Sequence, residues 1–529
     1  MSAQRNPVTS DLSGWSPGAD GPSSRSHEST SEGISALGRP EPGVVWTGTG
    51  ALGQGRGLLS SLLAAGAGLC WLALGQREGI VWAILSAIPG GLLLAAGMAS
   101  ALWSGDLRIR QYGVLGAVLG TTLALMFAGA ASVPAGLVLF ALSLGAGMAL
   151  AAAALRGEPR HAGVPVPEPS AALAAQVALD ELVLSTMHLT IPVSLRETDW
   201  CRIRREVEQA VDLFAREGWL DSPESYHRVP AAPSQFEVRV KRAGGMAFEH
   251  VRFASDYRPW PDEPGASRWL SYAPNRTAHA WLLRHHGGAR PWLICLHGYQ
   301  MGTAAIDLRL FRAEWLKHRA GFNVAFPVLP LHGPRKIGRR SGDGYLSGDF
   351  LDTLHAQTQA LWDIRRLLCW IRELEPHAPL APAVFGLSLG GYNAALLAAH
   401  VADLSAVIAG IPATDFVRLF WRHGTPHGSR LLEHVGLSRE PVSRALSLVS
   451  PLALPAKVER ENLFVFGGVA DRLVPPDQIR DLWEHWNRPQ IAWYQGGHLT
   501  FPADTGVRRM IRMALSGAGA TVQPSPTHG

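Results

Sequence analysis

The chain of 529 residues has few cysteines, no metal-ligand motif and no cluster of basic residues. Its four cysteines show no paired spacing and no C-x-x-C, which excludes a disulfide scaffold and fits a reducing compartment. No H-E-x-x-H and no close group of His, Cys and acidic residues occurs, so no metal is expected. The net charge of +5 comes from scattered residues, mostly Arg, which argues against a nucleic-acid partner.

The two ends of the chain lack aliphatic runs. Residues 1–50 are rich in Ser, Gly and Pro and predict a disordered tail, and residues 516–529 predict a second one. The first apolar stretch begins too far from Met1 for a secretory signal, so none is expected.

Charge is also missing from three long apolar runs, at residues 57–74, 80–103 and 112–155. A bilayer core takes about 20 apolar residues per helix. The third run is long enough for two such helices, broken near Pro134. We therefore expect a four-helix transmembrane region over residues 57–155. The alternative is a buried soluble bundle, but soluble helices of this length rarely lack a polar stripe.

The basic residues near the span ends predict the orientation, because cytoplasmic loops carry the excess of Lys and Arg. Arg39 and Arg56 precede the first helix, and Arg108 and Arg110 precede the third. Arg156 and Arg160 follow the fourth helix. Both termini are therefore predicted to be cytoplasmic. No ionisable residue lies mid-span, so the region is interpreted as an anchor rather than a transport path.

Residues 156–235 connect this region to the rest of the chain. They begin with a proline-rich linker to about residue 170, which is followed by helical patterns at 171–187 and 200–217. The two helices predict a cap, or a platform between membrane and enzyme. A role in packing alone is the simpler alternative.

The stretch with the clearest chemistry is G-x-S-x-G at residues 386–390, with Ser388 at its centre. A short apolar strand precedes it and a helical pattern follows it. A serine on such a turn needs a strained backbone and small neighbours, which explains the flanking glycines. The turn would expose the serine hydroxyl at a sheet edge and at a helix N-terminus.

A nucleophilic serine needs a base and an orienting acid. Asp471 and His498 each follow a predicted strand, in the order Ser, Asp, His. Asp415 follows an earlier strand and is the alternative acid. Upstream, the strand at 292–296 leads into His-Gly-Tyr-Gln-Met-Gly at residues 297–302, where an oxyanion loop is expected.

These motifs, in this order, resemble the α/β-hydrolase superfamily, in its serine esterase and lipase branch, fused to an N-terminal multi-span membrane region. The resemblance covers residues 236–515 and implies an α/β fold, with a mostly parallel central sheet, flanking helices and a lid at about 416–456. It implies an acyl-enzyme mechanism without cofactor or metal. The implied roles are nucleophile for Ser388, base for His498, acid for Asp471, and oxyanion donors for Leu389 and for Tyr299 or Gln300.

A basic loop follows the strand at 323–326 and leaves the same sheet edge. It carries Arg335, Arg339 and Arg340, which predict a rim for an anionic substrate group. A solvated loop, or pairing with Asp343 and Asp349, is equally open. Together with the membrane region and an apolar lid, the rim favours a lipid-like ester or another small ester.

Other activities fit the same motifs. A peptidase of the prolyl-oligopeptidase-like branch shares the fold and triad, although no propeller domain is recognisable. An acyltransferase would use the same acyl-enzyme with another acceptor. A non-catalytic membrane scaffold is a third alternative, against which the complete Ser, Asp and His set argues. The sequence does not indicate an oligomeric state.

Overall fold

The computed structural model describes residues 51–102, 107–191, 193–194, 196–424 and 426–520, all within one compact unit. The tail predicted at 1–50, with Arg39, lies outside these residues. So do residues 521–529 of the predicted C-terminal tail, whereas its first residues belong to helix α18 (Thr505–Gly517).

A nine-stranded sheet forms the centre of the described structure, in the order β1-β2-β3-β5-β4-β6-β7-β8-β9. The first three strands run antiparallel to their neighbours, and the strands from β5 across to β9 are parallel. The strands are β1 (Glu237–Ala243), β2 (Met246–Ala254), β3 (Thr277–Leu283), β4 (Trp292–Leu296), β5 (Asn323–Pro327), β6 (Ala383–Leu387), β7 (Val407–Gly410), β8 (Leu463–Gly468) and β9 (Gln490–Tyr494).

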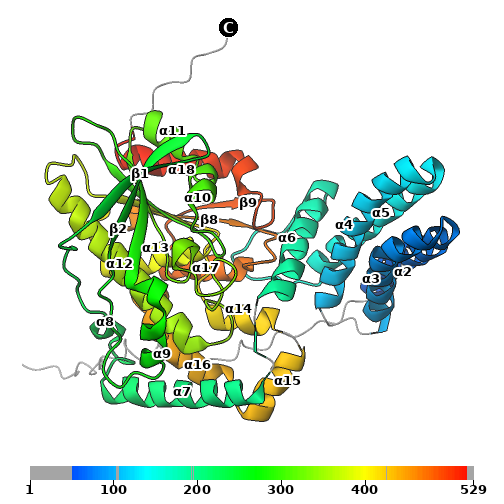
Figure 1. The fold of residues 1–529 in the computed structure, drawn as a ribbon, viewed down its shortest axis with the longest axis horizontal. Helices are drawn as coiled ribbons and strands as arrows, with labels where there is room; N and C mark the ends of the chain where they lie inside the picture. Colours follow the sequence, from blue (N-terminus) through cyan, green and yellow to red (C-terminus); the bar gives the residue numbers. More distant parts are fainter. Residues whose placement is uncertain (1–50, 103–106, 192, 195, 425, 521–529) are drawn as a thin grey trace, which may run out of the picture. The chain divides into compact units, whose positions relative to one another are not determined.

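The parallel strands are short, continuous apolar runs because both faces of the sheet are covered. In β4, Ile294 and Leu296 belong to the core on one face, and Leu293 and Cys295 to the core on the other. Helices α12 (Phe350–Leu374) and α13 (Leu389–His400) cover the first face, and α10 (Ala304–Leu310), α11 (Ala313–His318) and α18 cover the second (Figure 1).

One predicted helix is divided in the structure. The pattern at 305–318 predicts a single helix, but α10 ends at Leu310 and α11 begins at Ala313. Arg312 between them has φ of 52°, in the left-handed region that interrupts a helix. Its side-chain type gives no sign of this break.

Four apolar helices precede the sheet in the chain: α2 (Ala51–Arg77), α3 (Ile80–Leu102), α4 (Leu107–Ala130) and α5 (Val133–Arg156). All four are long and apolar enough to cross a membrane, judged by length and composition. Many of their exposed side chains are large and apolar, including Leu62, Ile80, Ile84, Leu125 and Leu137.

Close packing inside the bundle depends on small residues. A Cβ added to Gly116 would lie 2.8 Å from Leu92 Cβ, and one on Gly120 would lie 2.6 Å from Ser143 Oγ. Ser143 also accepts a hydrogen bond from the buried Trp71 indole, at 2.8 Å. Gly116 and Gly120 therefore allow α4 to pack closely on α3 and α5 of the same chain.

Helices α6 (Ala171–Thr190), α7 (Glu197–Arg216) and α8 (Pro223–Tyr226) follow the linker. The Ser185 hydroxyl of α6 donates to the carbonyl of Gln111 in α4, at 2.9 Å. Helix α7 packs on the segment predicted as a lid, where the ring centroids of Trp200 and Phe420 are 6.1 Å apart.

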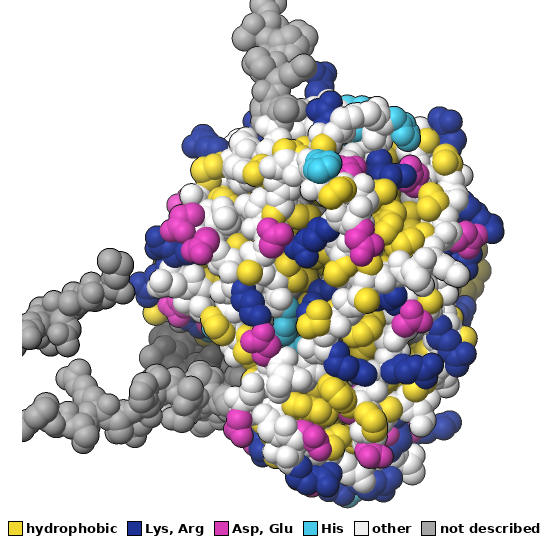
Figure 2. Space-filling view, turned by 90° about the vertical axis from the view of Figure 1, so that its left-hand side faces the viewer, with side chains coloured by type: hydrophobic (Ala, Val, Ile, Leu, Met, Phe, Trp, Pro, Cys, Tyr) yellow, Lys and Arg dark blue, Asp and Glu magenta, His cyan; other side chains and the backbone are white. Residues whose placement is uncertain are grey.

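The segment predicted as a lid contains α14 (Phe416–His423), α15 (Pro426–Val435) and α16 (Arg439–Leu446). Helices α9 (Ala266–Ser271) and α17 (Pro476–His485) complete the α-helices of the described residues. On the face drawn in Figure 2, basic and acidic side chains are interspersed among scattered apolar ones. That face therefore presents no continuous field of one sign.

Candidate active site

Ser388 occupies a strained turn between β6 and α13. Its backbone has φ of 57° and ψ of −114°, a combination that costs a non-glycine residue about 1–3 kcal/mol. The Ser388 N–H donates to the carbonyl of Gly410 at 2.9 Å, which holds the turn against strand β7. The half-buried serine stands directly before the N-terminus of α13.

The flanking glycines are sterically required. A Cβ on Gly386 would lie 2.0 Å from the carbonyl oxygen of Gly390, and one on Gly390 would lie 1.9 Å from the carbonyl oxygen of Leu296. These contacts are with backbone atoms, which cannot move aside as a flexible side chain can. The spacing of the motif thus follows from the close approach of strand, turn and helix.

Asp471 and His498 lie after β8 and β9 and form a direct hydrogen bond. His498 Nδ1 and Asp471 Oδ2 are 2.6 Å apart, and both side chains are buried. Asp471 Oδ1 accepts from the backbone N–H groups of Leu473 and Val474, at 2.9 and 2.8 Å. The Asp471 carboxylate can only accept here, so Nδ1 carries the proton and Nε2 is the nitrogen left for a reacting group.

Burial opposes the charged form of His498, but the charge and hydrogen bond of Asp471 outweigh it and raise the pKa of the imidazole above its ordinary value. Among the described residues, no hydrogen bond joins Ser388 Oγ to His498. The structure brings the acid and the base into contact and places the serine at the same edge of the sheet.

The alternative acid, Asp415, has a different structural role. One of its carboxylate oxygens caps α14 by accepting from the Arg418 N–H at 2.9 Å. The other accepts from Arg418 Nε at 3.0 Å. The hydrogen bonding therefore pairs His498 with Asp471 rather than with Asp415.

A second buried carboxylate, Asp180 of α6, lies behind the acid and the base. Asp180 Oδ2 accepts from the backbone N–H of His498 at 2.8 Å and from that of Arg472 at 3.0 Å. Burial raises the pKa of Asp180 to about 7, and the nearby charge of Asp471 adds to the shift. The neighbouring Glu181 pairs with Arg472 Nε at 2.6 Å.

The sequence interpretation missed this contact. The signal was present, because Asp180 and Glu181 are the only charged residues in the predicted helix at 171–187. Adjacent acids in an otherwise apolar helix need a buried partner or solvent. The pattern, however, does not say which segment of the chain provides that partner.

The predicted oxyanion donors also lie at this edge. Leu389 is the first residue of α13, where a backbone N–H has no acceptor within the helix. A Cβ on Gly298 would lie 3.7 Å from Ser388 Cβ, so the loop carrying Tyr299 and Gln300 adjoins the strained serine turn. Gln300, with φ of 63°, closes a turn in which the Met301 N–H donates to the Gly298 carbonyl at 3.3 Å.

His297 holds this loop in place. Its Nδ1 bonds to the Gly298 carbonyl at 2.8 Å and its Nε2 accepts from the Leu329 N–H at 3.1 Å. Both ring nitrogens are thus occupied by the backbone. Within the described ranges, no three His, Cys, Asp or Glu side chains converge in a way that would hold a metal ion.

The prediction that Arg335 belongs to a solvent-facing rim is wrong, because the side chain is buried. Its side chain is 0% exposed and pairs with Asp363 of α12 at 2.8 Å. It also donates to the carbonyls of Val328 and Asn275, at 2.9 and 3.1 Å. Arg335 therefore fastens the start of the loop to the core, because a buried guanidinium needs a counter-charge and acceptors.

Arg339 and Arg340 are exposed farther along the same loop. Ser341 donates to the Met301 carbonyl, and a Cβ on Gly342 would lie 2.7 Å from the Tyr299 ring. The loop thus borders the predicted oxyanion segment.

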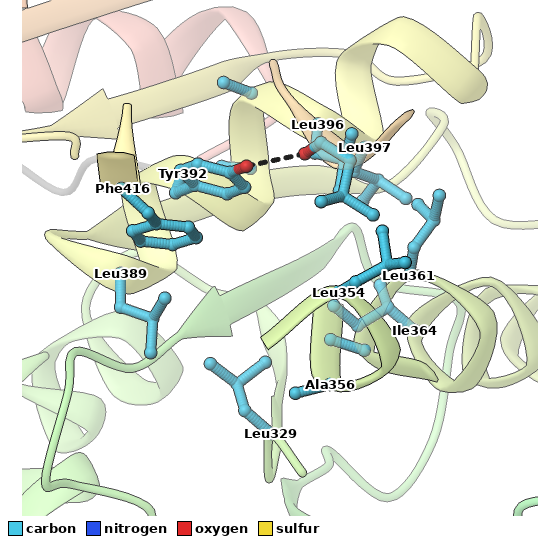
Figure 3. Packing of buried hydrophobic residues seen from close by; sticks show 14 of the residues in the cluster. Leu329, Leu354, Ala356, Leu361, Ile364, Leu389, Tyr392, Leu396, Leu397 and Phe416 are labelled. Atoms are coloured by element: carbon cyan, nitrogen blue, oxygen red, sulfur yellow. Dashed lines mark hydrogen bonds between the residues drawn. The ribbon is translucent and has the colours of Figure 1, made fainter. Parts of the chain in front are cut away.

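Aromatic and aliphatic side chains pack the start of the predicted lid segment against helix α13, which follows Ser388 (Figure 3). Phe416 of the lid stacks on Tyr392 of α13 with ring centroids 4.2 Å apart. The Tyr392 hydroxyl donates to the Val449 carbonyl at 2.7 Å. Leu389, next to Ser388, belongs to the same core and lies near both rings in Figure 3.

No family model matches the chain. Two curated proteins of Mycobacterium tuberculosis, "Uncharacterized protein MT2702" of strain CDC 1551 / Oshkosh and "Uncharacterized protein Rv2627c" of strain ATCC 25618 / H37Rv, are each 40% identical over 362 residues. Each match covers 68% of this chain and 86% of the relative. The chain belongs to their family.

Solved structures similar to the chain include acetyl xylan esterase 1 from Thermoanaerobacterium sp. JW/SL YS485, with a TM-score of 0.41 and 15% identity over 57% of this chain and 93% of that one. The Pyrococcus furiosus esterase Pf2001 has a TM-score of 0.31 and 15% identity over 53% and 92%. The chain itself has the α/β-hydrolase fold, as its mostly parallel sheet and the strained serine turn after β6 indicate.

The burial of Arg335 predicts a large effect on stability. Arg335→Ala leaves Asp363 as an unpaired buried charge, so we expect a loss of about 3–5 kcal/mol in the free energy of unfolding. The exposed Arg339→Ala is the control, with a change within about 0.5 kcal/mol. Denaturant titration in detergent measures both. Unchanged stability of Arg335→Ala would contradict the structural role.

Proposed function

We propose that the chain is a membrane-anchored serine hydrolase that cleaves an ester or thioester bond through Ser388, Asp471 and His498. The observation that carries the proposal is a strained serine turn on the same sheet edge as a 2.6 Å Asp471–His498 hydrogen bond. Strain at a half-buried serine persists only where the surrounding structure enforces it. A buried acid–base pair at the same sheet edge as such a serine suits the activation of its hydroxyl.

In the proposed reaction Ser388 Oγ attacks the substrate carbonyl carbon while His498 Nε2 takes the hydroxyl proton. The N–H groups of Leu389 and of Tyr299 or Gln300 stabilise the negative oxygen of the tetrahedral intermediate. His498 then protonates the leaving alcohol or thiol, and water releases the acyl group from Ser388 by the reverse sequence. Proton transfer requires Ser388 Oγ and His498 Nε2 to come within hydrogen-bond distance, a contact that often tightens only with substrate bound.

Asp471 has two tasks in this scheme. It keeps the proton on Nδ1 of His498, so that Nε2 faces the reaction, and its charge stabilises the imidazolium that forms. The same stabilisation of the protonated imidazole by Asp471 raises the pKa of His498. No metal or cofactor is needed for any of these steps.

We propose a lipid-like ester as the substrate class. Four apolar helices support anchoring in a membrane, where such an ester is concentrated. The apolar lid packed beside Leu389 suits an acyl chain, because it keeps water away from the acyl-enzyme. Arg339 and Arg340, exposed on the loop that borders the oxyanion segment, suit an anionic headgroup.

We further propose that the hydrolase part faces the cytoplasm. Arg108, Arg110 and Arg156 lie at the helix ends on the side that this orientation places inside. At the connection between α2 and α3, Arg77, the last residue of α2, stands beside Glu78. The excess of Arg on one side of a bundle normally marks the cytoplasmic side.

The proposed chemistry predicts that hydrolysis of a p-nitrophenyl ester series is lost in Ser388→Ala, with kcat lower by about 10⁶-fold. Ser516→Ala, at an exposed position of α18, is the matched control and should keep the wild-type rate. Turnover that survives in Ser388→Ala would contradict the assignment. A folded wild-type protein without turnover of short, long or anionic esters would favour the scaffold alternative.

The proposed orientation predicts which introduced cysteines react from outside the cell. In intact cells a membrane-impermeant maleimide should label Glu78→Cys, in the loop between α2 and α3, and should not label Ser516→Cys until the cells are lysed. The unmodified protein corrects for its four native cysteines. Labelling of Ser516→Cys with protection of Glu78→Cys would reverse the topology.

A further inference from the structure

Helix α6 precedes the whole hydrolase sheet in the chain, yet it provides a hydrogen-bond acceptor to the two loops that carry the acid and the base. Asp180 is separated from His498 by 318 positions, and its Oδ2 accepts from the His498 N–H at 2.8 Å. The same oxygen accepts from the Arg472 N–H, next to Asp471, at 3.0 Å. One atom therefore ties together the backbones of both loops.

We infer that Asp180 is a positioning residue of the active site, which fixes the acid loop and the base loop relative to each other and makes catalysis depend on α6. This inference rests on the function proposed above. Asp180 does not touch the reacting atoms and acts only through the backbones of Arg472 and His498. The catalytic unit accordingly begins before β1 and includes the segment that follows the membrane helices.

A buried ion network holds α6 in this place. Arg472 is buried and pairs with Glu181 at 2.6 Å and also with Glu158, which follows α5. Glu158 in turn pairs with Arg422 of the lid at 2.8 Å. Burial opposes the charge of Glu158, yet Arg472 and Arg422 outweigh it and lower its pKa to about 2. Withdrawing α6 would leave Arg472 without one of its counter-charges, so the contact is not incidental.

The network also connects the triad to the apolar helices. Glu158 lies two residues beyond Arg156, the last residue of α5, and Ser185 of α6 bonds to Gln111 of α4. These contacts join the apolar helices to Arg472 and to the helix that carries Asp180.

The geometry distinguishes two substitutions of Asp180. Within the part of the chain that the structure describes, Oδ1 has no hydrogen-bond partner, whereas Oδ2 accepts both bonds. Asparagine can keep its oxygen at the Oδ2 position and place its amide nitrogen where Oδ1 now lies. Alanine removes the acceptor and leaves two buried N–H groups unpaired.

The test measures ester turnover by the full-length protein in detergent. Asp180→Ala should lower kcat by about 100-fold, as misplacement of catalytic groups by about 1 Å does, with KM within about threefold. Asp180→Asn should restore most of the loss. Asp504→Ala is the matched control, because it removes an acceptor from the Val507 N–H at 2.8 Å, at the start of α18, and should leave kcat unchanged.

A second variant reaches the same contact without changing Asp180. A Cβ on Gly497 would lie 2.6 Å from Asp180 Oδ2, so Gly497→Ala should displace the carboxylate and lower kcat as Asp180→Ala does. Should Asp180→Ala fail to fold, Gly497→Ala takes its place. Wild-type kcat in either folded variant would overturn the inference while leaving the proposed hydrolase function, tested separately with Ser388→Ala, intact.

A measurement that needs no substrate tests the positioning role of Asp180 separately from the proposed hydrolase function. The downfield proton resonance of the Asp471–His498 hydrogen bond, assigned by its loss in His498→Ala, should be present in the wild type and in Asp180→Asn and lost or shifted in Asp180→Ala. An unchanged resonance in Asp180→Ala would overturn the positioning role even if no ester substrate were found.

Discussion

The site depends on one geometric constraint, that the carboxyl ends of neighbouring parallel strands meet at one edge of a sheet. Strands β4, β6, β8 and β9 end there, and the loops after them carry Gly298, Ser388, Asp471 and His498. Residues spread over some two hundred positions thus share one edge. The strained turn at Ser388 and the Asp471–His498 bond are details built on that arrangement.

The structure surrounds this edge with buried charge rather than with apolar packing alone. Asp180, Glu181 and Arg472 are buried together behind the acid and the base. Such clusters are costly unless every charge is paired, and removing one partner is far more harmful than the net gain from the pair. Helix α6 is therefore held at the site by the Arg472–Glu181 ion pair, because moving α6 away would leave a buried charge unpaired.

Local sequence patterns were sufficient for the sheet, and they placed Ser388, Asp471 and His498 after strands, where the structure has them. Ser388, Asp471 and His498 each follow a short buried run, and the glycine spacing around Ser388 reflects contacts between backbone atoms close in the chain. The four apolar helices were equally readable, because length and the absence of charge are properties of the sequence itself.

Long-range pairing was not readable. In the sequence Arg335 does not differ from other basic loop residues. In the structure it pairs with Asp363, which lies 28 positions away on a helix. Asp180 meets loops about 300 positions away, and no local pattern names such a partner. The break between α10 and α11 likewise depends on the positive φ of Arg312, which an arginine side chain does not predict. A pattern can show that a charge needs a partner, but only the fold identifies the partner.

The most direct measurement of the central claim is to map the adduct of a fluorophosphonate probe on the full-length protein in detergent by mass spectrometry. The account predicts one adduct, on the peptide that contains Ser388, with labelling lost in His498→Ala and after heat denaturation, because only an assembled acid–base pair activates the serine. A well-folded protein without an adduct, or with an adduct on another serine, would contradict it.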